Sequence, residues 1–174
     1  YVPIAHRGKG AAVRTGVLQA SGDPIVFLDA DLTIPAEIVT EFLAALARGA
    51  DIAVASRYVA GSRVHRPWWR SVMSGTFRVF ARAVVPTGVQ DTQCGAKAYR
   101  TEVARELFSR QRLDGFAFEV EVLFLARRAG YRIVEIPFTL RQQGPTSVDL
   151  LRDGVRMLGD TIRIRILAAL GRYG

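Results

Sequence analysis

The sequence predicts an α/β fold with a mostly parallel sheet. Short apolar runs that suit buried strands alternate along the chain with amphipathic stretches that suit helices. The chain has 174 residues, of which 49% are hydrophobic, so it is long enough for one domain with a sizeable core. We therefore expect residues 1–174 to form a single domain.

The first part of the chain predicts two helix–strand pairs. Residues 10–20 predict a short helix, and residues 24–30 (PIVFLDA) predict a strand covered on both faces, because a compact apolar run lies between turn residues. A second helix is expected to start at residues 33–35 and to stop at Gly49. Residues 51–56 then predict another strand.

The rest of the chain continues this alternation. Residues 67–85 place large apolar side chains at spacings of three and four, with arginines between them, as in an amphipathic helix that can lie on a lipid surface. The later elements are a strand over 94–99, a helix through 103–107, a helix over 119–128, a strand over 131–140 and a basic helix over 151–169.

Charge and composition narrow the function classes. The net charge is +8, and no acidic residue lies between Asp51 and Asp91, where six arginines fall. Such a block favours an anionic partner, whether phosphate, nucleic acid or an acidic lipid surface, and its alternative is a solvated basic face.

Cys94 is the only cysteine, which excludes a disulfide within the chain and a metal site built from several cysteines. No uncharged stretch exceeds eight residues, so we expect no membrane-spanning helix.

Asp29 and Asp31 are the most informative pair of residues. They stand where the first predicted strand ends, the edge at which α/β sheets bind ligands. Residues two apart in extended backbone point to the same side, so both carboxylates can face one Mg²⁺ or Mn²⁺ ion that also contacts substrate phosphates. The alternative is that both are ordinary turn or capping acids.

Three further groups are candidates for binding. Lys9 and Gly10 lie at the start of the first helix, where backbone N–H groups and the lysine can approach a diphosphate, although the segment also suits an ordinary helix entry. Arg70 and Ser74 are four residues apart on one helical face, where they can share a phosphate group. Asp91 is a further acid in a turn before a strand.

Taken in order, these segments resemble family 2 glycosyltransferases that load a sugar onto polyprenyl phosphate, the dolichyl-phosphate glucosyltransferase and mannosyltransferase group. The resemblance covers nearly the whole chain and is closer to the glucosyl-transferring branch. It is carried by residues 8–16 (GKGAAVRTG), 29–31 (DAD), 56–58 (SRY), 70–74 (RSVMS), 91–97 (DTQCGAK) and 116–121 (FAFEVE).

The resemblance implies a GT-A fold, a Rossmann-like sandwich, and an inverting transfer of a hexose from a nucleotide sugar. Glucose from UDP-glucose is the expected donor. Asp29 and Asp31 would hold Mg²⁺ or Mn²⁺ against the diphosphate, with Asp31 as the closer ligand and Asp29 near the ribose or the metal. Lys9 and Gly10 would contact the donor.

For the acceptor, the resemblance implies that Arg57, Arg70 and Ser74 receive the phosphate of a dolichyl or undecaprenyl lipid. Asp91 would lie near the reacting centre, so Asp91 and Asp31 are the expected catalytic residues. A phosphate monoester is already anionic at pH 7, since its second pKa is near about 6, so a strong general base is unnecessary.

The same resemblance implies that the first strand–helix–strand unit of the fold precedes this chain, which would leave the catalytic domain incomplete at its amino terminus. We expect a cytoplasmic protein held peripherally on the inner face of a membrane, and no nucleic-acid partner. Three alternatives remain: GDP-mannose as donor, a soluble acceptor, and a non-enzymatic basic module that binds membrane or nucleic acid.

Overall fold

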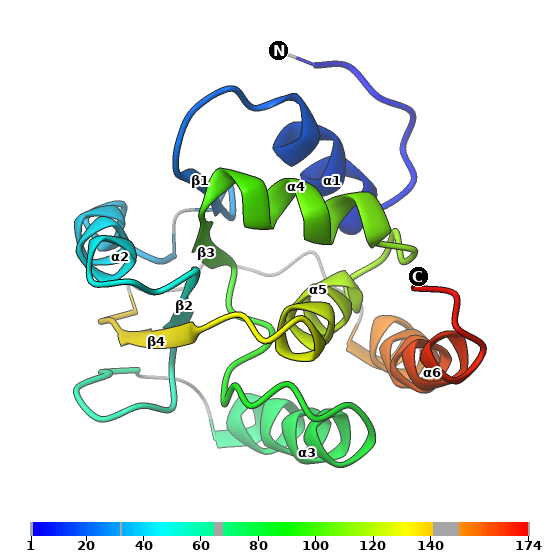
Figure 1. Cartoon of the computed structure of the whole chain (residues 1–174). Helices are drawn as coiled ribbons and strands as arrows, with labels where there is room; N and C mark the ends of the chain where they lie inside the picture. The colour runs from blue at the N-terminus through cyan, green and yellow to red at the C-terminus, as the bar shows by residue number, and fades with distance from the viewer. Residues whose placement is uncertain (1, 32, 65–67, 141–149, 174) are drawn as a thin grey trace.

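The computed structural model describes residues 2–31, 33–64, 68–140 and 150–173, without the side chains of residues 68–71, 73 and 150–152. This part of the chain forms a four-stranded sheet with helices on both faces (Figure 1). In chain order the elements are α1 (Lys9–Gln19), β1 (Ile25–Leu28), α2 (Ile38–Ala47), β2 (Ile52–Ser56), α3 (Trp68–Val84), β3 (Ala96–Tyr99), α4 (Thr101–Arg110), α5 (Phe118–Arg128), β4 (Ile133–Pro137) and α6 (Leu150–Ala169).

Each helix and strand expected from the sequence is present, and the bounds differ by a few residues. The largest difference is at α2, which begins at Ile38 rather than at residues 33–35. There the chain first makes turns, in which the N–H of Ile38 donates to the carbonyl of Pro35 at 3.1 Å. The strand expected over 131–140 shortens to β4.

The sheet has the order β1-β3-β2-β4 and is mixed. β1, β2 and β4 point the same way, but β3 runs antiparallel to both of its neighbours, so two of the three strand pairings are antiparallel and the sheet is mixed rather than mostly parallel. After α3 the chain returns along the sheet, so that β3 starts beside the end of β1, with Ala96 opposite Leu28. The start of β3 therefore lies at the carboxyl ends of the other strands.

The pleat of the strands divides the core in two. Ala53, Ala55, Ala96 and Ala98 face α2, where their small side chains let the helix pack closely. Alternate residues of β2 and β3, such as Ile52 and Tyr99, face the layer that contains α4 and α5. Because Lys97 lies two residues before Tyr99, it also points into that layer, where its side chain is buried.

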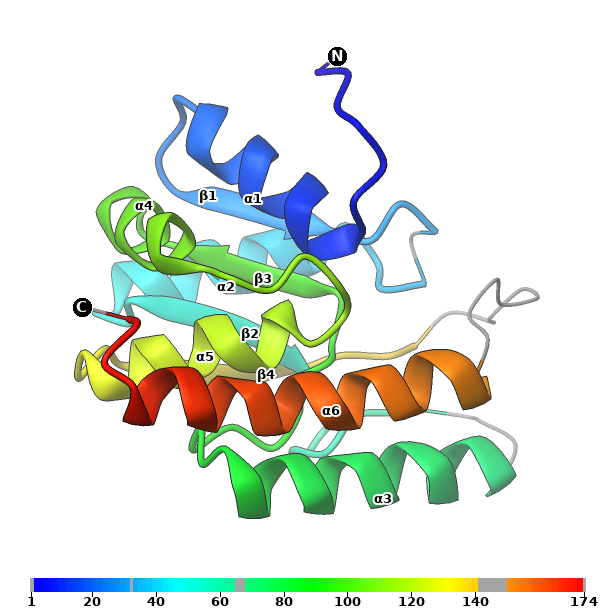
Figure 2. The ribbon, with the colours of Figure 1, turned by 90° about the vertical axis from the view of Figure 1, so that its right-hand side faces the viewer.

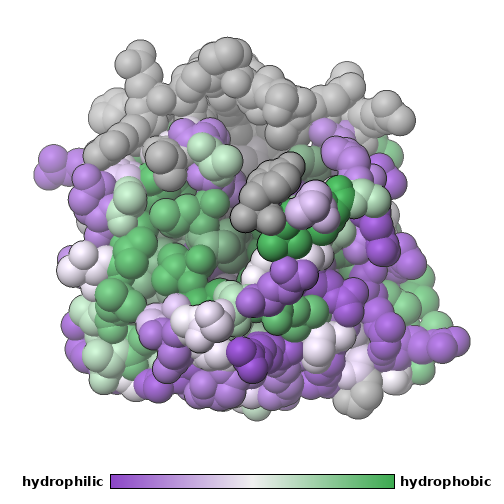
Figure 3. Space-filling model, turned by 90° about the horizontal axis from the view of Figure 1, so that it is seen from above, coloured by the Kyte–Doolittle hydropathy of each residue, from purple (hydrophilic) through white to green (hydrophobic). Residues whose placement is uncertain are grey.

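β1 forms one edge of the sheet and, among the described residues, pairs only with β3. Figure 3 views the molecule from above Figure 1, the side on which this edge lies, and shows hydrophobic side chains gathered over one half of that face. The side chains of Val26, Phe27 and Leu28 in β1 are half-buried.

A close approach between α1 and the segment before α5 depends on Gly10. A Cβ atom at this position would lie 2.7 Å from the carbonyl oxygen of Leu113 and 2.9 Å from that of Gly115. The amide of Gln111 joins the same two segments by donating to the carbonyl oxygens of Gly10 at 3.0 Å and Leu113 at 2.7 Å. Gly10 is thus required for packing, whatever else it contacts.

We predict that Gly10→Ala lowers the free energy of unfolding by about 1–3 kcal/mol, because rigid backbone atoms must move to admit the methyl group. Gly16→Ala, in the same helix, is the matched control: a Cβ there meets nothing within 4 Å. It should raise the free energy of unfolding by roughly 0.5–1 kcal/mol. Urea denaturation of both variants measures the difference, and equal changes would contradict the packing role of Gly10.

Candidate active site

The candidate site lies at the carboxyl ends of β1 and β2. Asp29 and Asp31 follow β1, and Arg57 follows β2. Figure 2 shows that the N-terminal ends of α1, α3 and α5 lie on the same side of the molecule. Ligands of α/β proteins bind at this edge of the sheet, where helix N-termini also favour anions.

Asp29 and Asp31 present accessible carboxylates. The side chain of Asp29 is 38% exposed, and Asp31 is exposed. The backbone N–H of Asp29 donates to the carbonyl of Gly95 at 2.8 Å, and Asp31 Oδ1 accepts from the N–H of Thr33 at 3.1 Å. A Cβ atom on Gly95 would lie only 1.9 Å from Asp29 Oδ2, so glycine at position 95 makes room for this carboxylate.

Lys9 joins Asp29 to a second carboxylate. Its Nζ lies 2.9 Å from Asp29 Oδ1 and 2.7 Å from Glu119 Oε1. Burial by itself would lower the pKa of Lys9, but the charges of Glu119 and Asp29 outweigh it and raise the pKa above its ordinary value. Lys9 is therefore a protonated amine beside the carboxylates at the end of β1.

Glu119 is buried in α5 and accepts from two lysines. While Oε1 accepts from Lys9, Oε2 accepts from Lys97, whose Nζ also donates to the carbonyl of Cys94 at 2.6 Å. The side chains of Glu119 and Lys97 are only 2% and 1% exposed. Cys94 is buried as well, and burial raises the pKa of its thiol to about 12, so Cys94 is a neutral packing residue.

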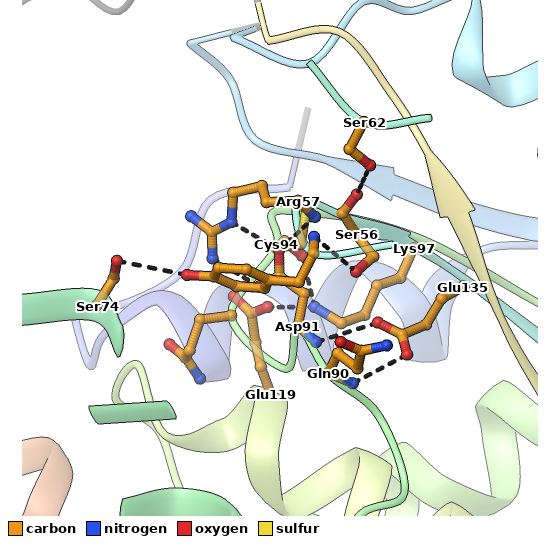
Figure 4. A network of polar contacts seen from close by, with 12 residues as sticks. Ser56, Arg57, Ser62, Ser74, Gln90, Asp91, Cys94, Lys97, Glu119 and Glu135 are labelled. Atoms are coloured by element: carbon orange, nitrogen blue, oxygen red, sulfur yellow. Dashed lines mark hydrogen bonds and ion pairs between the residues drawn. The ribbon is translucent and has the colours of Figure 1, made fainter. Parts of the chain in front are cut away.

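Arg57 and the buried Asp91 form a second ion pair, in which Arg57 is partly buried (Figure 4). Asp91 Oδ2 accepts from Nε of Arg57, and Oδ1 accepts from its Nη2, both at 2.6 Å. Glu135 of β4 holds the turn in place by accepting the backbone N–H groups of Gln90 at 2.9 Å and Asp91 at 3.1 Å. Burial would lower the pKa of Arg57, but the hydrogen bonds and charge of Asp91 raise it above its ordinary value.

Tyr58 connects this pair to α3. Its hydroxyl donates to Ser74 Oγ at 3.4 Å, and its ring centroid lies 5.7 Å from Cζ of Arg57. Arg70 lies one helical turn before Ser74 in α3, but its side chain is outside the described part of the structure.

The predicted site residues thus fall into two groups. Lys9 and Asp29 are in direct contact, and Asp31 follows Asp29 in the chain. The second group is Arg57 with Asp91, to which Ser74 is joined through Tyr58. Gly10 lies apart from both groups in its contacts, against the segment before α5.

No individual role for Glu119, Lys97 or Tyr58 was predicted from the sequence. A usable signal was present for Glu119, since α5 is strongly apolar around it and a carboxylate in a buried helix needs a cationic partner. The cationic partner of Glu119 could not be predicted from the sequence, because Lys9 is 110 residues away from it in the chain.

The carboxylates at the end of β1 fit a divalent cation that is shared with a substrate. Among the described residues there is no group of three or more His, Cys, Asp or Glu side chains that could hold a metal ion. Mg²⁺ is commonly bound through one or two carboxylates, with water and substrate phosphates as its other ligands. Asp29 and Asp31 supply that number of accessible carboxylates.

Comparison with known proteins shows the family of the chain. Residues 1–108 match the model of glycosyl transferase family 2. The chain is 29% identical to a dolichyl-phosphate beta-glucosyltransferase from Dictyostelium discoideum, over 95% of this chain and 53% of that protein. It is 33% identical to a polyprenol monophosphomannose synthase from Mycolicibacterium smegmatis, over 82% of this chain and 57% of that protein. The chain thus spans about half the length of these relatives.

Solved structures show the same fold. Glucosyl-3-phosphoglycerate synthase from Mycobacterium tuberculosis, in complex with Mn²⁺, UDP-glucose and phosphoglyceric acid, superposes with a TM-score of 0.67. The identity is 24%, over 99% of this chain and 57% of that one, so the likeness establishes the fold alone. The GT-A expectation is therefore confirmed, and because the family model covers more than half of the residues, the chain belongs to glycosyl transferase family 2.

Proposed function

We propose that this chain carries the catalytic site of an inverting, metal-dependent transferase that moves glucose from UDP-glucose to a polyprenyl phosphate. The observation that carries this proposal is the contact between Lys9 and Asp29, 2.9 Å apart beside Asp31 at the end of β1. Accessible carboxylates next to a protonated amine suit a cation together with a diphosphate. The names of the dolichyl-phosphate and polyprenol relatives support the lipid acceptor.

On the donor side, Asp29 and Asp31 would hold Mg²⁺ or Mn²⁺, with Asp31 as the closer ligand. Such a cation neutralises charge that develops on a departing nucleotide diphosphate. Lys9 contributes a permanent positive charge on the same side, which two carboxylates keep in place. In this proposal Lys9 orients Asp29 and can donate to a diphosphate oxygen.

On the acceptor side, Arg57, Arg70 and Ser74 would receive the lipid phosphate. Asp91 takes the N–H of Nε and one N–H of Nη2, so the two N–H groups of Nη1 and the second N–H of Nη2 are left to donate to an acceptor. Because both oxygens of Asp91 accept from Arg57, we assign Asp91 the role of positioning this guanidinium. The phosphate nucleophile is already ionised at pH 7, so the reaction does not require Asp91 to remove a proton.

A second candidate keeps the chemistry and changes the donor to GDP-mannose. The polyprenol monophosphomannose synthase of Mycolicibacterium smegmatis and a dolichol-phosphate mannosyltransferase of Pyrococcus furiosus, 30% identical, favour it. Titration calorimetry of UDP-glucose and GDP-mannose, each with and without Mn²⁺, separates the two donors. The titration should be repeated on a longer version of the chain, since the relatives are about twice as long.

α6 supports peripheral association with an anionic membrane. Large apolar side chains stand exposed at every third or fourth position, while Ile164 on the opposite face is fully buried. The exposed stripe consists of Val155, Leu158, Ile162, Ile166 and, just beyond the helix, Leu170. Arg156, Arg163 and Arg165 are exposed in the same helix. An apolar stripe accompanied by arginines fits the boundary between acyl chains and anionic headgroups.

No helix in the part of the chain that the structure describes is long and apolar enough to cross a bilayer. We propose that α6 instead lies along the cytoplasmic face of a membrane, near the lipid acceptor. This orientation would let a polyprenyl phosphate reach the enzyme without leaving the bilayer.

Replacing Asp31 with Asn tests the metal role. We expect Mn²⁺-dependent donor affinity to fall by at least about 10-fold, the loss that follows even when only a residue behind a metal ligand is changed. Glu41→Gln, an exposed acid on α2, is the control and should bind donor like the parent protein. Unchanged Mn²⁺-dependent donor binding in Asp31→Asn, measured by calorimetry, would remove Asp31 from the metal site.

The double variant Ile162→Glu/Ile166→Glu tests the membrane surface. Binding to phosphatidylglycerol vesicles in a flotation assay should weaken by at least about 10-fold, because each apolar side chain loses roughly 1.5–3 kcal/mol of burial. Leu43→Glu, at an exposed apolar position on α2, is the matched control and should float like the parent protein. Equal flotation of the double variant and the parent would show that α6 is not the docking surface.

A further inference from the structure

Arg78 places a second guanidinium against the Tyr58 ring. It lies on α3 one turn after Ser74, and its Cζ is 4.2 Å from the centroid of the ring, closer than Cζ of Arg57 at 5.7 Å. Ser74 meets the hydroxyl of the same tyrosine. Figure 4 shows Ser74 approaching from α3 towards the cluster that contains Arg57 and Asp91.

The two arginines differ in how their charge is balanced. Asp91 accepts two hydrogen bonds from the guanidinium of Arg57, so that pair is close to neutral. Arg78 has no ion pair with a carboxylate among the described residues, and its Nε is buried without a hydrogen-bond partner. The Tyr58 ring attracts the guanidinium but offers it no acceptor in its face.

A buried N–H without an acceptor costs free energy, and the rest of the Arg78 guanidinium, which is only partly buried, can still donate to a ligand. The planar fork of arginine suits a phosphate group, which can accept two of its N–H groups at once. A donor diphosphate, which brings a divalent cation with it, fits the region at the end of β1 better. There Asp29, Asp31 and Glu119 repel an anion that arrives without a cation. The Arg78 side of the site has no such carboxylate excess, because Asp91 is already paired.

We propose that Arg78, held by the Tyr58 ring, binds the phosphate of the lipid acceptor together with Arg57 and Ser74. This inference rests on the proposed function and adds two residues to the acceptor site, Arg78 and Tyr58. Tyr58 is a positioning residue: its ring holds Arg78 and its hydroxyl holds Ser74. Arg78 supplies the positive charge that Arg57, neutralised by Asp91, does not.

The test compares Arg78→Ala with Arg82→Ala. Arg82 lies one turn further along α3 and is exposed, so its removal makes the same change in charge away from the site. Binding of a short-chain prenyl monophosphate is measured by calorimetry without donor. Arg78→Ala should weaken it by about 10- to 100-fold, as expected for losing a charge-assisted hydrogen bond, and Arg82→Ala by less than about 2-fold.

Steady-state transfer, measured in the longer version of the chain, provides the second readout. The KM for polyprenyl phosphate should rise in Arg78→Ala, while the KM for the donor stays that of the parent protein. Arg78→Lys should recover only part of the affinity, since an ammonium keeps the charge but not the planar fork. Tyr58→Phe keeps the ring and should bind better than Tyr58→Leu. Thermal unfolding checks that each variant is folded.

Two results would overturn the proposal. One is prenyl monophosphate binding that Arg78→Ala and Arg82→Ala weaken equally, which would indicate a general charge effect. The other is an equal loss of donor and acceptor affinity in Arg78→Ala, which would make Arg78 structural or part of the donor site. Inorganic phosphate serves as competitor: if it displaces the prenyl compound at equal concentration, the site recognises free phosphate rather than the lipid.

The proposed function fails in a different way. If the longer version of the parent protein binds prenyl monophosphate through Arg78 but transfers no sugar to it, the phosphate site is supported and the proposed reaction is contradicted. If the parent transfers sugar and Arg78→Ala leaves acceptor binding and KM unchanged, the reaction stands and the role of Arg78 falls.

Discussion

Glu119 is the buried carboxylate at which α1, β3 and α5 meet. Lys9 of α1 and Lys97 of β3 both donate to it, from positions that the chain separates by 110 and 22 residues. Removing one partner from a buried ion pair costs about 3–5 kcal/mol, because the remaining charge loses its counterion. Each member of the cluster therefore depends on the others, and Asp29, which Lys9 also contacts, depends on all of them.

The direction of β3 brings the two halves of the site together. Since β3 starts where β1 ends, the turn before it lies at the carboxyl edge of the sheet and carries Asp91, Cys94 and Gly95 there. Gly95 makes room for the Asp29 carboxylate, and Asp91 meets Arg57 at the end of β2. In a wholly parallel sheet the start of this strand would lie at the opposite edge.

Local sequence patterns predicted the elements well because burial and turn residues determine them over a few positions. The apolar run before Asp29 and the arginine-bearing stripe over 67–85 both became the expected strand and helix. The reversed direction of β3 was not predictable in this way, since Cys94–Tyr99 has the same apolar pattern whichever way the strand runs. Strand direction is set by the path of the connection from α3.

The site was predicted as a set of residue types, but not as a set of contacts. Asp29, Lys9, Arg57 and Asp91 were all selected from their positions in the sequence, and the structure places them in two clusters. Their pairing was not predictable, because ion pairs between residues 20 to 110 positions apart depend on the tertiary fold. From the sequence, Arg78 was only one of six arginines in a basic block. Its contact with the ring of Tyr58, which follows β2, appears only in the folded structure.

The position of β1 at the edge of the sheet also affects the tendency of the protein to self-associate. Within the described residues, one side of β1 pairs with β3, and no strand lies on its other side, where the apolar side chains of the strand are half-buried. An edge of this kind accepts an additional strand from any source, including another molecule. This edge therefore makes self-association through β1 a risk at high protein concentration.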